Sequence, residues 1–152
     1  MLRKSGIQAL KTMLELAQAP AQWRSAQELA EAQHISAAMV EQLLLRLRRA
    51  ELVEARRGRS GGYRLARTAR SIGLAEVLAA AAAPAASLAT SRADQDITPA
   101  ESRATEQVTA ALERRLERSI TQALAQLTLE DLLFDLRSAE ANMDDDGGLL
   151  LG

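Results

Sequence analysis

The chain has no cysteine among its 152 residues and a single histidine, His34. Without thiolates it cannot form disulfides, thiolate zinc sites or an iron–sulfur cluster held by its own cysteines, and it has no cysteine nucleophile. One histidine leaves most metal sites and acid–base schemes without a partner, and no combination of nucleophile, base and orienting group is recognisable. We therefore expect no enzymatic activity, no metal site and no cofactor.

Aromatic residues are also scarce, being limited to Trp23, Tyr63 and Phe134. The hydrophobic share of 47% consists mostly of alanine and leucine, which favour helices. No uncharged apolar run reaches the roughly 18 residues that a membrane span needs, and the N-terminus lacks the cleavage site of a secretory signal. The sequence predicts a helix-rich cytoplasmic protein with no membrane partner, of a size typical of one domain or a small domain with an appended segment.

The charges are unevenly distributed, although the net charge is only -1. Residues 41–70 contain nine arginines and three glutamates, whereas residues 129–146 contain seven acidic residues and one arginine. A basic segment favours an anionic partner, and an acidic end is typical of a solvated tail.

The first fifty residues show the pattern of three helices. The first helix is expected to end near Pro20, and Ser25 with Glu28 three residues later has the spacing of a capping box at the start of the second. Ser36 is the N-cap candidate of the third, which should reach about Ala50. Two capped helices joined by about three residues form a helix-turn-helix pattern. The predicted buried face of the first helix consists of apolar residues at helical spacing: Ile7, Leu10, Met13, Leu14 and Ala17.

A short hairpin and one further helix follow. Residues 52–55 and 63–65 have strand character and enclose a turn rich in glycine, which permits positive φ angles and close backbone approach. A hairpin directly after a helix-turn-helix is a wing. The apolar residues from Ile72 to Leu78 predict a helix that closes the small domain near residue 83.

The C-terminal half is predicted to contain a linker and a long helix. Residues 84–99 have no apolar period, so we expect a linker or a loop that serves an effector. From residue 100 an apolar residue recurs every fourth position over about 27 residues, roughly 40 Å of helix, which is longer than a small domain needs. We expect this stripe to pack against a second copy, the alternative being that it folds back on its own domain. Thr128 should cap a short helix, followed by a disordered acidic tail over 138–152. The predicted dimerisation residues are Val108, Leu112, Leu116, Ile120 and Leu124.

The segments ISAAMVEQLLLRLRRAELVEARRGRSGGYRLAR and SIGLAEVLAAA resemble the winged-helix regulator family of IscR, NsrR and CymR. They match its recognition helix, its glycine-rich wing ending in GGYRL and the helix after it, and the similarity covers residues 1 to about 137. The resemblance implies a mainly α-helical fold with a small β-wing. Residues 1–83 would then form a winged helix-turn-helix DNA-binding domain, and residues 100–137 dimerisation helices that cross between subunits.

The resemblance also implies a function, which is that of a homodimeric, sequence-specific transcription regulator, commonly a repressor, reading an imperfect palindrome in double-stranded DNA. Cluster-binding members carry three cysteines in the segment that matches 84–106, where this chain has none. It would therefore act without its own cysteine-ligated cluster. Three alternatives stay open for the signal that it senses: a small-molecule effector, a protein effector, or no signal at all.

The DNA-contacting residues can be assigned by their chemistry. A helix N-terminus favours phosphate, small or apolar residues there can meet thymine methyl groups, and Glu and Gln pair with cytosine and adenine edges. In the family, the glutamate that matches Glu41 tunes the accepted sequence. Arginines neutralise phosphates or enter a narrow minor groove. The predicted contacts are Ser36, Ala38, Met39, Glu41, Gln42, Arg46, Arg48, Arg49, Arg56, Arg57, Arg59 and Ser60.

A second function class also fits a winged helix, because fold alone does not decide function. The protein could be an interaction adaptor that binds a partner enzyme through its wing or its acidic tail. The excess of arginine over residues 41–70 favours nucleic acid over this alternative.

Overall fold

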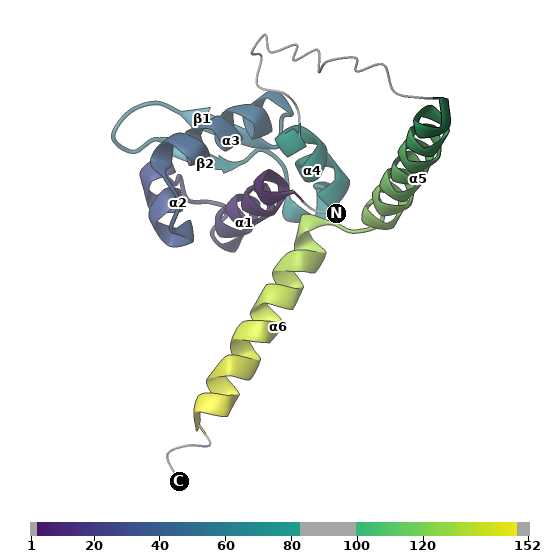
Figure 1. The fold of residues 1–152 in the computed structure, drawn as a ribbon. Coiled ribbons are helices and arrows are strands. Elements are labelled where there is room, and N and C mark those ends of the chain that lie inside the picture. Colours follow the sequence, from purple (N-terminus) through teal and green to yellow (C-terminus); the bar gives the residue numbers. More distant parts are fainter. Residues whose placement is uncertain (1–2, 83–99, 149–152) are drawn as a thin grey trace.

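The computed structural model of the protein describes residues 3–82 and 100–148 (Figure 1). Within them the fold is mainly helical with one two-stranded antiparallel sheet, which confirms the predicted fold class. The elements in chain order are α1 (Lys4–Gln18), α2 (Ala26–Gln33), α3 (Ala37–Arg49), β1 (Val53–Arg56), β2 (Gly62–Leu65), the 3-10 helix η1 (Ala69–Ser71), α4 (Leu74–Ala82), α5 (Ala100–Leu124) and α6 (Leu129–Gly148). The predicted linker over 84–99 lies outside the described residues.

The helix-turn-helix forms as the capping signals predict. The Ser25 hydroxyl accepts from the Glu28 amide and the Glu28 carboxylate accepts from the Ser25 amide, so both halves of the capping box are present. α2 ends at His34, which adopts the left-handed conformation with φ 55°. Ser36 then caps α3 by accepting from the Met39 amide at 3.3 Å. His34 is thus a residue of the turn between α2 and α3.

The buried face of α1 differs from the predicted one. Met13 and Ala17 are buried as predicted, but Ile7 is exposed and Leu10 and Leu14 are only half-buried. Ala9, Thr12 and Leu16 are buried in addition. Thr12 can be buried because its hydroxyl is satisfied: the hydroxyl donates to the Gln8 backbone carbonyl at 2.9 Å and accepts from the side-chain amide of Gln33 at 3.0 Å. Hydrophobic spacing alone does not register this polar contribution to the core.

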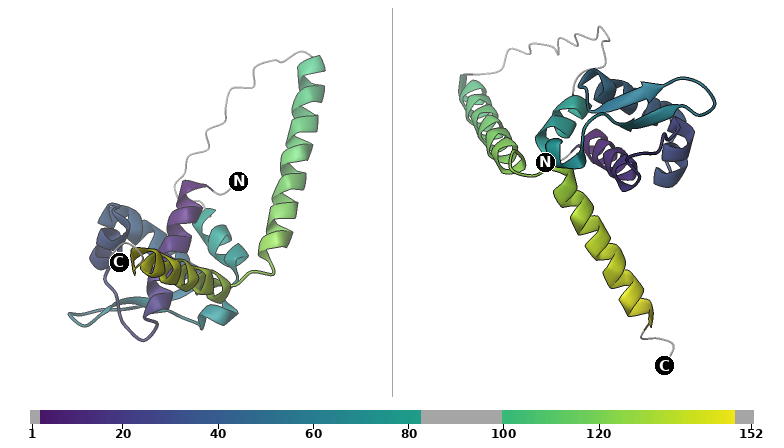
Figure 2. Two further views of the ribbon diagram at one scale, coloured as in Figure 1. Left: turned by 90° about the horizontal axis from the view of Figure 1, so that it is seen from below. Right: turned by 180° about the vertical axis from the view of Figure 1, so that it is seen from behind.

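The wing is a hairpin with a third extended segment beside it. Val53 pairs with Leu65 and Arg56 with Gly62, within one residue of the predicted strands. Arg24, in the segment between α1 and α2, exchanges backbone hydrogen bonds with Tyr63, its amide donating at 2.9 Å and its carbonyl accepting at 2.8 Å. Figures 1 and 2 show the turn of the hairpin projecting beyond α2 and α3.

The first turns of α6 are part of the winged domain, whereas the family resemblance predicts that residues 100–137 together form dimerisation helices. Leu129 and Leu133 are buried in the same hydrophobic core as α1, α3 and the wing. The Leu74 amide donates to the Leu127 carbonyl at 2.9 Å, and the Leu129 amide donates to the Ile72 carbonyl at 2.8 Å. Thr128 and Asp131 cap the helix through reciprocal hydrogen bonds, as predicted for Thr128.

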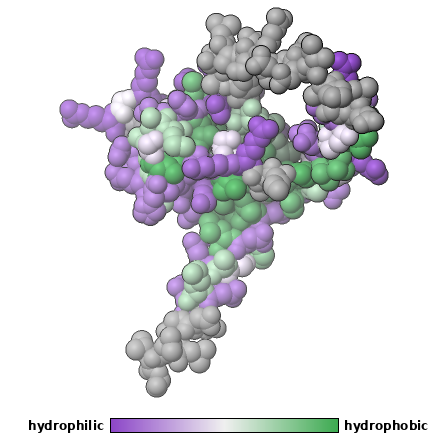
Figure 3. Space-filling view, viewed as in Figure 1, coloured by the Kyte–Doolittle hydropathy of each residue, from purple (hydrophilic) through white to green (hydrophobic). Residues whose placement is uncertain are grey.

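The two C-terminal helices extend away from the winged domain on different sides (Figure 2). α6 continues to Gly148, so the expectation of a short helix followed by a disordered tail from residue 138 is wrong for 138–148. Residues 139–143 include alanine, glutamate and methionine, which favour helix, and no glycine interrupts the helix before Gly147. Figure 3 shows hydrophobic surface gathered around the junction of α4, α5 and α6.

Candidate nucleic-acid interface

One side of α3 is anchored in the core and the other faces outward. Val40, Leu43, Leu44 and Leu47 are buried, and together they fix the rotation of the helix about its axis. The opposite side is an edge of exposed side chains, which we call the α3 edge: Ser36, Ala38, Met39, Glu41, Gln42, Leu45, Arg48 and Arg49. The structure therefore brings nearly all of the predicted α3 contacts onto one surface.

Leu45 belongs to this edge and was not predicted. It is 47% exposed. In the sequence it stands among three leucines that are buried, Leu43, Leu44 and Leu47. Its spacing could have identified it, since it lies four residues after Glu41 and three after Gln42, which places all three on the same side of the helix.

Arg46 has a different environment from the other arginines of α3. Its side chain is half-buried, and its Nη1 donates to the Ala81 carbonyl at 2.9 Å. Ala81 lies in the last turn of α4, where a cation is favoured by the unsatisfied carbonyl groups and by the helix dipole. Arg46 thus joins α3 to the end of α4, and its guanidinium is engaged inside the domain.

The base of the wing holds two arginines in place. The ζ-carbon of Arg64 lies 4.3 Å and that of Arg56 lies 4.5 Å from the centroid of the Trp23 ring. Arg64 also pairs with Glu54 across the hairpin, and Arg56 donates to the Ser60 carbonyl. The predicted contacts Arg56 and Ser60 are therefore bonded to each other.

The tip of the wing carries two exposed arginines, Arg57 and Arg59. Neither forms a hydrogen bond or ion pair with another of the residues that the structure describes, and Gly58 between them has φ 104°. A positive φ of this size suits glycine and turns the chain sharply. The two cations are thus presented at the projecting turn of the hairpin (Figure 1).

A row of exposed apolar side chains follows α5. Val108 is 69% exposed, Leu112 54% and Leu116 53%, and Ile120 is also exposed, while Leu124 is half-buried. These side chains amount to a large apolar area that one copy leaves in contact with water, which marks an interaction surface. The dimerisation residues predicted from the sequence therefore share one exposed side of the helix.

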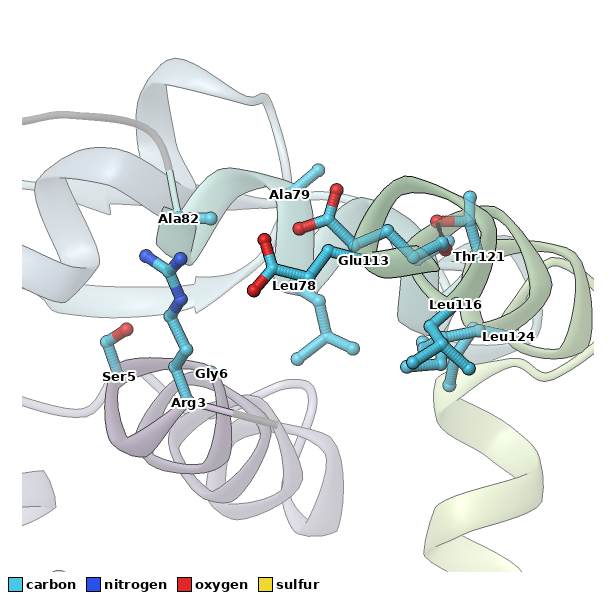
Figure 4. Close-up of a pocket in the computed structure, with 13 residues that line it drawn as sticks. Arg3, Ser5, Gly6, Leu78, Ala79, Ala82, Glu113, Leu116, Thr121 and Leu124 are labelled. Carbon is cyan, nitrogen blue, oxygen red and sulfur yellow. Dashed lines mark hydrogen bonds between the residues drawn. The ribbon is translucent and has the colours of Figure 1, made fainter. Parts of the chain in front are cut away.

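A cavity of about 900 Å³ separates α5 from the winged domain. Figure 4 shows Arg3, at the start of α1, facing Glu113 of α5 across Leu78. Leu116 and Leu124 line the α5 wall, so the cavity and the apolar row of α5 are parts of the same surface. No helix in the described part of the chain is long and apolar enough to cross a membrane.

Comparison with known proteins gives consistent matches. Residues 2–135 match the Rrf2 family, described as iron-dependent transcriptional regulators. The chain is 36% identical to an HTH-type transcriptional regulator of Synechocystis over 134 residues, which are 88% of this chain and 87% of that protein. It is 44% identical over 82 residues to the HTH-type transcriptional regulator IscR of Cereibacter sphaeroides, covering 52% and 53% of the two chains.

Solved structures agree with these matches. The IscR structure from T. potens superimposes with a TM-score of 0.67 at 30% identity, over 91% of this chain and 90% of that one. The structure of CymR, the global cysteine regulator of B. subtilis, gives a TM-score of 0.63 at 25% identity, over 88% and 95% of the two chains.

The iron in the family's description does not fit the donors of this chain. It has no cysteine, and the described residues contain no group of three or more histidine, aspartate or glutamate side chains arranged to hold a metal ion. We therefore assign no role to iron. Its winged helix-turn-helix, the family match over residues 2–135 and the similarity to IscR together show that the chain belongs to the Rrf2 family of DNA-binding transcriptional regulators.

Proposed function

We propose that this protein acts as a homodimeric repressor that reads an imperfect palindrome in double-stranded DNA, without a cysteine-ligated cluster of its own. The observation that carries the proposal is the α3 edge. Its polar and apolar side chains face outward from a helix whose other side is buried. The wing adds Arg57 and Arg59, which have no partner among the residues that the structure describes.

In this proposal α3 enters a major groove by its N-terminal half. The Glu41 carboxylate accepts a hydrogen bond from a cytosine amino group, and the Gln42 side-chain amide both donates to and accepts from an adenine edge. Ala38, Met39 and Leu45 give close approach and apolar contact with thymine methyl groups. The Ser36 hydroxyl accepts from the Met39 amide, so its own hydrogen is available for a phosphate oxygen.

The wing contributes affinity that is independent of the base sequence. Arg57 and Arg59 enter the flanking minor groove or neutralise its phosphates, and Arg48 and Arg49 contact phosphates beside the major groove. Arg46 is not included among the contacts because its guanidinium is bonded to the end of α4. Arg56 acts within the wing, where it is bonded to Ser60.

The apolar row of α5 supports dimerisation. A second copy that covers Val108, Leu112 and Leu116 removes their apolar surface from water, which is favourable at about 25 cal/mol per Å². Binding to a palindrome requires a twofold axis that sets the two recognition helices roughly 34–36 Å apart, the separation of successive major grooves on one face of DNA.

Selection of genomic DNA fragments by the purified protein tests the proposal. The wild-type protein should enrich one dyad-symmetric sequence, Arg57→Ala should retain much less DNA, and Glu41→Ala should enrich a different sequence. Weak retention of all fragments without a shared sequence would contradict it and support the adaptor alternative. An unchanged sequence with Glu41→Ala would remove that residue from base recognition.

A further inference from the structure

The only tryptophan of the chain lies against the wing rather than in the core. Trp23 belongs to the segment between α1 and α2, and the guanidinium groups of Arg56 and Arg64 both lie over its ring, at 4.5 and 4.3 Å. Such distances are those of cation–π contacts, which attract because the face of the indole ring is electron-rich. A residue distant in sequence from the hairpin therefore contacts both of its strands.

The backbone explains why Trp23 reaches this place. Arg24 pairs with Tyr63 as an additional edge of the hairpin, so Trp23 stands beside Arg64. Because side chains alternate along extended segments, Trp23 and Arg64 lie on the face that also carries Arg56. The Arg24 segment can approach only because position 62 is glycine: a Cβ there would lie 2.5 Å from the Arg24 carbonyl oxygen.

The two arginines are also tied at their other ends. Arg64 pairs with Glu54 of β1, and Arg56 donates to the carbonyl of Ser60, in the turn itself. The contacts form a continuous connection from Trp23, through Arg56, to the turn over 57–61. Arg57 and Arg59 are the cations of that turn left without a partner among the described residues.

We propose that Trp23 is a positioning residue for DNA binding: through Arg56 it holds the wing turn in the conformation that presents Arg57 and Arg59. The inference rests on the proposed function, in which these two arginines contact DNA. A turn that is already ordered loses less conformational entropy on binding than one that becomes ordered on the DNA. Trp23 itself need not touch the DNA.

The test compares Trp23→Leu with Trp23→Phe, a matched control that keeps an aromatic face. The probe is a fluorescein-labelled duplex that the wild-type protein selects from a random library. Trp23→Leu should weaken binding about three- to tenfold, and Trp23→Phe should weaken it less. The slope of log association constant against log salt concentration should stay at the wild-type value in both Trp23 variants, since no phosphate contact is lost. Arg57→Ala should reduce the magnitude of this slope by about 1. Hydrogen exchange of the amides over 57–61 should be faster in Trp23→Leu.

A double-mutant cycle shows whether Trp23 acts through the wing arginines. In the background of Arg57→Ala with Arg59→Ala, Trp23→Leu should have much less effect than in the wild type. If circular dichroism shows that Trp23→Leu does not fold, Arg56→Met takes its place in the cycle and in the exchange measurement, because it removes one cation from the ring and the bond to Ser60.

Three results would overturn the positioning role while leaving the proposed function intact: wild-type affinity and exchange rates in Trp23→Leu, a salt slope lowered as far as in Arg57→Ala, or additive effects in the cycle. If Arg57→Ala with Arg59→Ala binds the probe with wild-type affinity and salt slope, the proposed wing contact itself is wrong and the positioning role falls with it.

Discussion

At the scale of the residue, the arginines of the basic segment divide into different kinds. Arg46 is bonded inside the domain, Arg56 is bonded within the wing, and Arg57 and Arg59 are unpaired at the tip among the described residues. Charge counting along the sequence treats them alike, because a basic segment has the same composition whether its cations bind protein or DNA. The division depends on which carbonyl groups lie within reach, and that is known only once α3, α4 and the hairpin are placed.

Substitution of Arg46 should therefore change the stability of the fold, whereas substitution of Arg57 should change the salt dependence of DNA binding. Arg46→Ala loses a charge-assisted hydrogen bond and should lower the free energy of unfolding by about 1–2 kcal/mol, with the salt slope of DNA binding unchanged. Arg57→Ala should leave the free energy of unfolding within about 0.5 kcal/mol of wild type and reduce the salt slope by about 1. Urea denaturation and a salt titration of binding measure the two quantities. A reduced slope in Arg46→Ala would return that residue to the DNA interface.

Substitution of two glycines of the wing allows backbone strain to be separated from a steric clash in their effects on stability. At Gly62, with φ 138°, a Cβ would lie 2.5 Å from the Arg24 carbonyl oxygen, whereas at Gly58, with φ 104°, it would meet nothing within 4 Å. Gly58→Ala should cost about 1 kcal/mol through backbone strain alone, and Gly62→Ala should cost about 2 kcal/mol or more because the strain is combined with a backbone clash. Thermal unfolding measures both. Equal losses would show that Arg24 does not need to approach the hairpin closely.

At the scale of the element, capping and turn residues predict the helix-turn-helix and the wing well. Ser25, Ser36 and Thr128 act on hydrogen bonds within a few residues, so local sequence is enough to place them. The rotation of α1 and the attachment of α6 could not be predicted in this way. They depend on the Gln33 partner of Thr12 and on the pairing of Ile72 with Leu129, which are contacts between residues far apart in the chain.

Because the first turns of α6 pack in the core of the winged domain, deletion of the C-terminal half should affect the stability of that domain. Truncation at Pro99 removes Leu129 and Leu133 from the core as well as α5, so it should destabilise the winged domain and not only separate the copies. Leu129→Ala should lower the free energy of unfolding by about 2–5 kcal/mol, while Phe134→Ala, whose side chain is 70% exposed, should change it by less than about 0.5 kcal/mol. Chemical denaturation distinguishes them. A stable fragment 1–99 would contradict the shared core.

At the level of the entire chain, the exposed features that we assign to DNA binding and to dimerisation lie on different elements. The winged domain carries the α3 edge and the two wing-tip arginines, which have no partner among the described residues, and α5 carries the apolar row. The period of that row could be read from the sequence because side chains four residues apart share a side of the helix. The sequence alone leaves open whether this row packs against its own domain or against a second copy. In the structure Val108, Leu112 and Leu116 face water, so within one copy the row is not covered.

Charges placed on this row should separate the copies without unfolding them. Leu112→Glu combined with Leu116→Glu introduces carboxylates that cannot be buried unpaired in an interface, and both positions are exposed in one copy. Sedimentation velocity should show a monomer. Its circular dichroism spectrum and the melting temperature of its winged domain should match those of the wild type, and it should bind the selected duplex much more weakly. A control pair on the outward side of α5, Ala110→Glu with Arg114→Glu, should leave the dimer intact. A dimer that survives the leucine substitutions would locate the interface elsewhere.

The most direct test of the account is the mass of the complex between the wild-type protein and the duplex that it selects, measured by sedimentation equilibrium. We predict two protein chains on one dyad-symmetric duplex, with both half-sites protected and one turn of DNA between their centres. A saturated complex containing a single chain, or a failure to form any saturable complex with specific DNA, would contradict the central claim that this is a dimeric, sequence-specific regulator.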